Sequence, residues 1–300
     1  MSAQRANSHP TTGLAKQGLR PPIWMSTRLD RWLTRIGSHL VLVLFTAFVL
    51  YPLIWMVLTS LKTTRDMMAN VWGFPRTLVW ENYVTAWVGA RLDYALRNSV
   101  IVSVSTVVLV TCMAGLAGYA FARLRFRFAT PIFLLFIFTM NAPDNIIPLY
   151  VMLSKMHLTD NLLGLVLVLA ARGLPLSIFI FRAYFQSIPH ELLDAAKVDG
   201  CSELSAFMRV VVPVSTPAVV TVAVLELVGS WNEFMLALIL LHSPAVQTIP
   251  IAIQSFFMDY QTSWQPVFAA LTIGSIPVIA LYVIMQRQFI QGLTSGAIKG

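Results

Sequence analysis

Six long apolar blocks dominate this chain of 300 residues and set the main limit on its fold. They cover about 38–61, 98–121, 130–152, 162–183, 212–241 and 266–286. A bilayer core about 30 Å thick needs roughly 20 apolar residues per helix, and each block reaches that length. Strands of a membrane β-barrel alternate at every second residue, and these blocks do not. The sequence therefore predicts an all-α membrane protein with six transmembrane helices.

The polar stretch before the first block predicts a cytoplasmic N-terminal tail. Its first 22 residues scatter Gly, Pro, Ser and Thr, a composition typical of disorder. The tail is too long, and the block after it too extended, for a typical cleaved signal peptide. We therefore expect a partly disordered tail over 1–37 and a membrane domain over 38–300.

The distribution of Lys and Arg predicts the orientation of the helices. Fourteen of the 21 basic residues lie in the tail and at or after the ends of the second, fourth and sixth blocks. Six lie in the alternate segments, and Arg172 lies inside a block. Because cytoplasmic loops carry the excess of Lys and Arg, both termini are expected in the cytoplasm. The same bias explains the net charge of +8, and no nucleic-acid partner is indicated.

A charged segment, ELLDAAKVDG at 191–200, stands out inside the loop at about 184–212. Ser187 and Pro189 predict the start of a short helix there, which the acidic Glu191 stabilises near its N-terminus. Gly200 predicts its end, because glycine enters a left-handed turn without a side-chain penalty. Ser202 predicts the cap of a second short helix. The loop is thus expected to form a cytoplasmic helix-turn-helix.

The same segment is suited to contact with another protein. Small residues permit close approach and larger apolar ones give a partner an apolar surface; these residues are Ala195, Ala196, Gly200, Leu192, Leu193 and Val198. A loop that only joins two membrane spans would be polar throughout. The composition therefore favours a docking surface over a solvated connection.

The segment resembles the EAA loop of ABC importer permeases, whose pattern is Glu-Ala-Ala, three residues, Gly, nine residues, then Ile-x-Leu-Pro. Here 194–196 read Asp-Ala-Ala, and Gly200 follows at the same spacing. Nine residues later, 210–213 read Val-Val-Val-Pro. Asp for Glu and Val for Ile and Leu are the departures, and they keep charge and shape. The resemblance gives the coupling role to Glu191, Asp194, Ala195, Ala196, Asp199 and Gly200.

Further stretches resemble the carbohydrate-uptake permeases, and more narrowly the second, six-span subunit of maltose-type importers. They are GFPRTLVWENY (73–83), NSVIVS (98–103), AGYAFARLRF (117–126), IIPLYVML (146–153), SWNEFMLAL (230–238) and GAIKG (296–300). The resemblance implies a type I ABC importer permease in the inner membrane of a bacterial cell. It would form half of the translocation channel of an ATP-driven sugar importer.

The implied partners are a second permease subunit in a heterodimer, two ATPase subunits, an extracytoplasmic solute-binding protein, the sugar and membrane lipid. The chain contains no G-x-x-x-x-G-K-[ST] phosphate loop, so ATP and Mg are expected on the separate ATPase. No cofactor is expected on this chain, and the scattered histidines predict no metal site.

Polar residues inside the blocks are candidates for a solute pathway, because such groups normally face a cavity or a partner. The third block places Asn141, Asp144 and Asn145 on one helical face. For Asp144 and Asn145, a position near the outer membrane surface with a gating role is the alternative. Polar residues in the fifth block recur at the same helical spacing. The remaining candidates are Arg172, Glu226, Trp231, Asn232 and Glu233.

Each of these residues also has a structural interpretation. Hydrogen bonds between helices, including an ion pair of Arg172 with a carboxylate, explain them without a solute. The Trp231 ring can face a sugar or anchor the chain at the lipid interface. At the level of the whole chain, a self-powered secondary transporter and an intramembrane enzyme are the alternatives. The first should show internal repeats, and the second a nucleophile–base pair or a metal signature.

Overall fold

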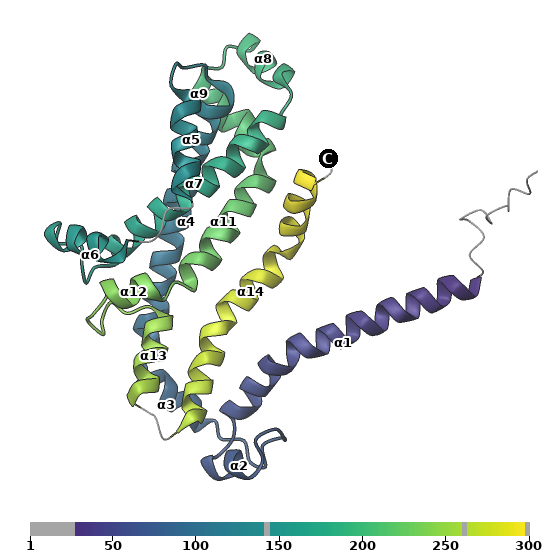
Figure 1. The fold of residues 1–300 in the computed structure, drawn as a ribbon, viewed down its shortest axis with the longest axis vertical. Coiled ribbons are helices and arrows are strands. Elements are labelled where there is room, and N and C mark those ends of the chain that lie inside the picture. Colours follow the sequence, from purple (N-terminus) through teal and green to yellow (C-terminus); the bar gives the residue numbers. More distant parts are fainter. Residues whose placement is uncertain (1–27, 141–144, 260–262, 298–300) are drawn as a thin grey trace, which may run out of the picture. The chain divides into compact units, whose positions relative to one another are not determined.

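The structure is a computed structural model that describes residues 28–140, 145–259 and 263–297 (Figure 1). The described residues are mostly helical and contain no strand. The longer helices are α1 (Arg28–Ser60), α4 (Leu92–Arg123), α7 (Leu162–Ser187), α11 (Thr216–Trp231) and α14 (Trp264–Ala297). The shorter ones are α2 (Thr64–Ala69), α3 (Glu81–Gly89), α5 (Ala129–Thr139), α6 (Ile146–Lys155), α8 (His190–Val198), α9 (Glu203–Ala206), the π-helix η1 (Phe207–Val211), α10 (Val212–Val214), α12 (Met235–Leu240) and α13 (Ile249–Asp259).

The chain divides into two units, 1–53 and 54–300, which are described separately. The first unit contains most of α1, whose apolar side chains from Leu40 to Leu50 are exposed. A continuous apolar helix with this surface is suited to lipid. This helix confirms the first predicted span.

The second unit is built around α4 and α7, which pack along most of their lengths, with α11 beside α4 and α14 beside α11 (Figure 1). Two clusters of buried side chains fill the space between α4 and α7. One includes Phe181, Phe185 and Phe207, and the other includes Leu165 and Leu240. The helices that border these clusters carry the candidate sites described below.

Four helices are long and apolar enough to cross a membrane, namely Thr34–Ser60, Leu92–Arg123, Leu162–Ser187 and Trp264–Ile284. A fifth candidate is the pair Glu203–Val214 and Thr216–Trp231, which is bent by 78°. These helices confirm several membrane spans in an α-helical protein. The count is four, or five if the bent pair is one span, among the residues that the structure describes.

The two remaining differences from the sequence prediction lie in the third and fifth blocks. In the third, α5 ends at Thr139 and α6 begins at Ile146, so the described residues of this block form two helices. In the fifth, the chain bends at Ser215 and α11 ends at Trp231. Pro213 and Pro217 flank that bend, and proline supplies no backbone N–H to a preceding helical turn.

Candidate functional site

The segment 190–206 forms two short helices, α8 and α9, joined by a tight turn; we call it the coupling hairpin. The N–H of Gly200 donates to the carbonyl of Lys197 at 3.0 Å, and that of Cys201 donates to Ala196 at 3.0 Å. This pair of bonds is a Schellman motif. Gly200 has a φ of +82°, the left-handed conformation that the sequence predicted for it.

The ends of the two helices confirm part of the capping prediction. Ser202 Oγ accepts a hydrogen bond from the N–H of Ser205 at 3.3 Å and caps α9. Ser187 does not start α8: it is the last residue of α7, and its hydroxyl donates back to the carbonyl of Tyr184. Pro189 is the residue before α8, and Glu191 lies in the first turn, as expected.

One face of α8 packs on its own chain and the other is open. Leu193 and Ala196 are buried in the cluster around Phe185, so Ala196 is covered by its own chain in this structure. Leu192, Ala195 and Val198 are exposed, Val198 at 87%. They recur at every third position, which places them on one side of the helix. The acidic residues Glu191, Asp194 and Asp199 are exposed as well.

Side chains of α4 hold the hairpin to the helix bundle. The Arg123 guanidinium donates to the carbonyl of Phe185 at 2.6 Å and to that of Ile188, at the C-terminal end of α7. One turn earlier, Tyr119 Oη donates to Glu203 Oε2 at 2.9 Å. Glu203 also pairs with Lys197 at 2.6 Å, and this hydrogen bond raises the pKa of Lys197. The hairpin and the end of α7 are therefore both in direct contact with α4.

A second group of polar side chains joins α7 to α11 within the bundle. Ser177 Oγ donates to Glu226 Oε1 at 2.8 Å. Gly173 lies one turn earlier on α7, and a Cβ there would come within 2.2 Å of Glu226 Oε2. With a Cβ at position 173, the Glu226 carboxylate would have to move from its present place. Glu226 is thus held against α7 by a hydrogen bond and by close backbone approach.

The next three candidates meet at the end of α11, where Arg172 of α7 approaches Asn232 and Glu233. Arg172 Nη1 lies 3.2 Å from Glu233 Oε2, which confirms the ion pair that the structural interpretation predicted. Glu233 follows α11, and its Oε1 accepts from the N–H of Leu236 at the start of α12. Asn232 is exposed, and its Nδ2 donates to the carbonyl of Val228 at 2.9 Å. These three residues form a polar cluster on the surface of this chain.

The position of the Trp231 side chain fits neither of the two roles that the sequence suggested for it. Its side chain is buried at 6% exposure beside Ala95, Ile249 and Ala252. The indole N–H points at the carbonyl of Gly274 at 3.4 Å. In this conformation the ring is enclosed by its own chain and turns neither toward a solute nor toward lipid.

Of the candidates in the third block, the structure describes Asn145 alone. Asn145 is the exposed residue before α6 and makes no side-chain cap there. Asn141 and Asp144 lie outside the described residues. The shared helical face expected for the three residues therefore stays a prediction.

Several structurally important polar residues escaped the sequence analysis. Asn98 is buried on α4, and its Nδ2 donates to the carbonyls of Ala245 and Gln247 at 2.9 and 3.0 Å. Asp160 accepts from the N–H groups of His242 and Ser243, and the hydrogen bond from the Ser243 hydroxyl lowers the pKa of Asp160. Both fix the segment between α12 and α13. The stretch NSVIVS was the signal for Asn98, but its partners are about 150 residues away.

Comparison with known proteins agrees with this arrangement. The family model described as "Binding-protein-dependent transport system inner membrane component" matches residues 22–295. A probable ABC transporter permease of Bacillus subtilis, YurM, is 35% identical over 262 residues, 86% of this chain and 87% of that protein. The sulfoquinovosyl glycerol transport permease SmoH of Agrobacterium fabrum is 34% identical over 254 residues, 84% of this chain and 89% of its own.

The fold is also shared with a solved structure. A chain of a bacterial ABC transporter involved in the import of the acidic polysaccharide alginate superposes with a TM-score of 0.79 at 23% identity. The match covers 88% of this chain and 99% of that one. The protein therefore belongs to the family of binding-protein-dependent transport system inner membrane components, and it is a permease subunit of an ABC importer.

Proposed function

We propose that this chain is one of two different permease subunits of an ATP-driven sugar importer and that it forms half of the channel. Two ATPase subunits and an extracytoplasmic solute-binding protein complete the assembly. SmoH transports a sugar derivative by its name, and another relative is an arabinooligosaccharide permease. Their similarity along most of this chain supports a sugar as the solute.

The observation that carries the proposal is the open face of α8. Leu192, Ala195 and Val198 expose an apolar strip, while the opposite face of the same helix is packed on the bundle. A short helix that is anchored on one side and apolar on the other fits the groove of a second protein. In this proposal the ATPase binds that strip, and the hairpin lies in the cytoplasm with both termini.

The proposal has six spans, because each pair of helices that comes from one apolar block is counted as one span. The bent pair ending in α11 is the fifth span, and α5 with α6 is the third. Both α5 and α6 are apolar but shorter than a membrane crossing, at 11 and 10 residues. Interrupted helices are tolerated within a membrane where protein or water satisfies the free backbone groups.

The solute route in this proposal runs along the polar groups at the α7–α11 contact. Arg172, Asn232 and Glu233 form its exposed part, and Glu226 its more enclosed part. Asn141, Asp144 and Asn145 extend it at the α5–α6 junction. Trp231 is buried and packs behind the residues that line the route. Planar amide and carboxylate groups of this kind hydrogen-bond the hydroxyls of a sugar.

We expect Asn232→Leu to lower sugar uptake per complex by a few-fold to about tenfold, because one lost hydrogen bond in binding is worth about 0.5–1.5 kcal/mol. The amide also caps α11, so Asn232→Ser serves as a control that keeps a donor at this position. Uptake is measured in proteoliposomes with a sugar chosen by thermal-shift screening of the solute-binding protein. A complex that assembles poorly but transports normally per molecule would instead assign Asn232 a structural role.

A further inference from the structure

The loop that follows α1 exposes large apolar side chains where a connecting loop would normally be polar. We call residues 62–80, which include α2, the α1 loop. Its large apolar side chains that are each more than half exposed are Met68, Trp72, Phe74, Leu78 and Trp80. Clusters of exposed apolar residues of this size generally mark a surface that another phase or protein covers.

The α1 loop turns back along the helix it leaves. Trp55 lies in the last two turns of α1, about 8 Å before its end at Ser60. Its ring centroid lies 5.6 Å from that of Trp72, and its indole N–H donates to the carbonyl of Val71 at 2.9 Å. The middle of the loop is therefore at the depth of Trp55 and not beyond the end of the helix.

The contact of Trp55 with α14 indicates the same depth of the loop in the membrane. The ring of Trp55 also contacts Phe268, in the second turn of α14, with centroids 5.1 Å apart. The apolar part of α14, Trp264–Ile284, has 21 residues. At 1.5 Å per residue it is about 32 Å long, hardly more than the bilayer core of about 30 Å. Its first turns therefore lie at the boundary of the hydrocarbon, and so does the loop beside them.

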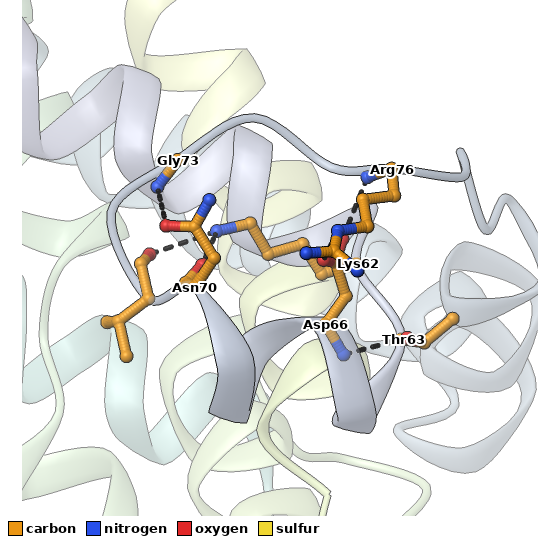
Figure 2. A network of polar contacts seen from close by, with 7 residues as sticks. Lys62, Thr63, Asp66, Asn70, Gly73 and Arg76 are labelled. Carbon is orange, nitrogen blue, oxygen red and sulfur yellow. Dashed lines mark hydrogen bonds and ion pairs between the residues drawn. The ribbon is translucent and has the colours of Figure 1, made fainter.

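A backbone segment at this depth needs partners for its polar groups. Figure 2 shows how the α1 loop supplies them. Lys62 is fully buried, and its ammonium donates to the carbonyls of Asn70 and Val71 at 2.8 and 2.9 Å. Asn70 Oδ1 in turn accepts from the N–H of Gly73 at 2.8 Å.

Two more side chains complete the network. Asp66 Oδ2 accepts from the N–H of Arg76 at 2.8 Å, and Thr63 Oγ1 caps α2 by accepting from the N–H of Asp66 (Figure 2). Asn82 donates to the carbonyls of Ser60 and Lys62 at 2.8 and 3.0 Å. These contacts satisfy several polar groups of the loop from within, while the side chains of Arg65 and Arg76 stay exposed beside the apolar ones.

We propose that the α1 loop is a membrane-interface anchor whose exposed apolar side chains insert among the lipids of the leaflet that α1 leaves at Ser60. Tryptophan favours this level of a bilayer because its ring is apolar and its N–H is polar. The anchor is continuous with α1, whose exposed apolar surface already requires lipid. The anchor also explains why Lys62 is buried, since its ammonium satisfies two carbonyls that would otherwise face lipid. The anchor does not depend on how the hairpin binds its partner.

The test uses the full transporter complex in lipid nanodiscs, with Cys112→Ser and Cys201→Ser as background. A bimane label is attached at Phe74→Cys, with Arg125→Cys, exposed just past the end of α4 and outside the hairpin, as the control. Quenching is measured with spin-labelled phosphatidylcholine in the bilayer and with iodide in the water. We expect lipid quenching at 74 to exceed that at 125 by about threefold or more, with weak iodide quenching at 74.

Two results would overturn the anchor. Strong iodide quenching at 74 with weak lipid quenching means that the loop lies in water. Protection of the label from both quenchers means that a protein subunit covers the loop. Because labels at exposed positions leave the packing unchanged, neither result reflects misfolding, and both leave the ATPase docking proposal untouched.

Discussion

Replacing Gly200 with Val is expected to lower uptake per complex by about tenfold while membrane insertion stays normal. Gly200 has a φ of +82°, and this left-handed conformation costs a residue with a side chain about 1–2 kcal/mol, a β-branched one at least that much. A penalty of about 1.4 kcal/mol shifts the population of the turn tenfold. The turn would open and α8 would lose its direction. ATP hydrolysis and uptake, measured together in proteoliposomes, would then be uncoupled.

The structure also supplies a matched control for this variant. A Cβ at Gly200 meets no atom within 4 Å, so a loss in Gly200→Val cannot come from a steric clash within the chain. Asparagine tolerates the left-handed conformation, and Gly200→Asn should transport at nearly the parental rate. Near-normal uptake by correctly inserted Gly200→Val would show that the turn has no part in coupling.

Arg123→Met is expected to reduce uptake by tenfold or more while the ATPase remains in the purified complex. The guanidinium donates to the carbonyls of Phe185 and Ile188, which end α7. A charged hydrogen bond of this type contributes about 1.5–3 kcal/mol, and its loss leaves carbonyls without a donor. The hairpin would still offer its open face to the ATPase, but its movement would reach α4 only through the hydrogen bond of Tyr119 to Glu203.

The control for this prediction is Arg125→Met, which removes the same charge from the same basic cluster. Arg125 is exposed and lies just past the end of α4. Copurified ATPase, ATP hydrolysis and uptake are compared for both variants. Equal losses in the two would assign the effect to charge on this surface and not to the carbonyl contacts of Arg123.

The sequence predicted the hairpin well because its determinants are local. Ser202 and Gly200 each act on N–H or carbonyl groups within four residues, so the chain itself shows where α8 stops and α9 starts. The length of the apolar blocks likewise predicted the spans that became α1, α4, α7 and α14. Such properties depend on composition and spacing over one helix.

Features that depend on distant partners were missed. The apolar composition of the fifth block does not indicate the 78° bend near Pro213 and Pro217, because the size of the bend depends on the helices packed around it. Trp231 could not be placed, since its burial comes from α4, α13 and α14. The sequence assigned no structural role to Lys62, because its hydrogen-bond partners are carbonyls eight and nine residues further along the chain.

The docking of the ATPase on α8 is tested most directly by photo-crosslinking from Val198, which is 87% exposed at the end of the open face. A photoreactive amino acid at this position, in the complex assembled in membranes, should give a covalent adduct with the ATPase subunit. Arg125, also exposed and outside the hairpin, is the comparison position. An ATPase adduct from 198 that is absent from 125 is the result we predict, and it also places the hairpin in the cytoplasm. An adduct from 198 only with lipid would contradict the docking surface, and one only with the solute-binding protein would contradict the orientation as well.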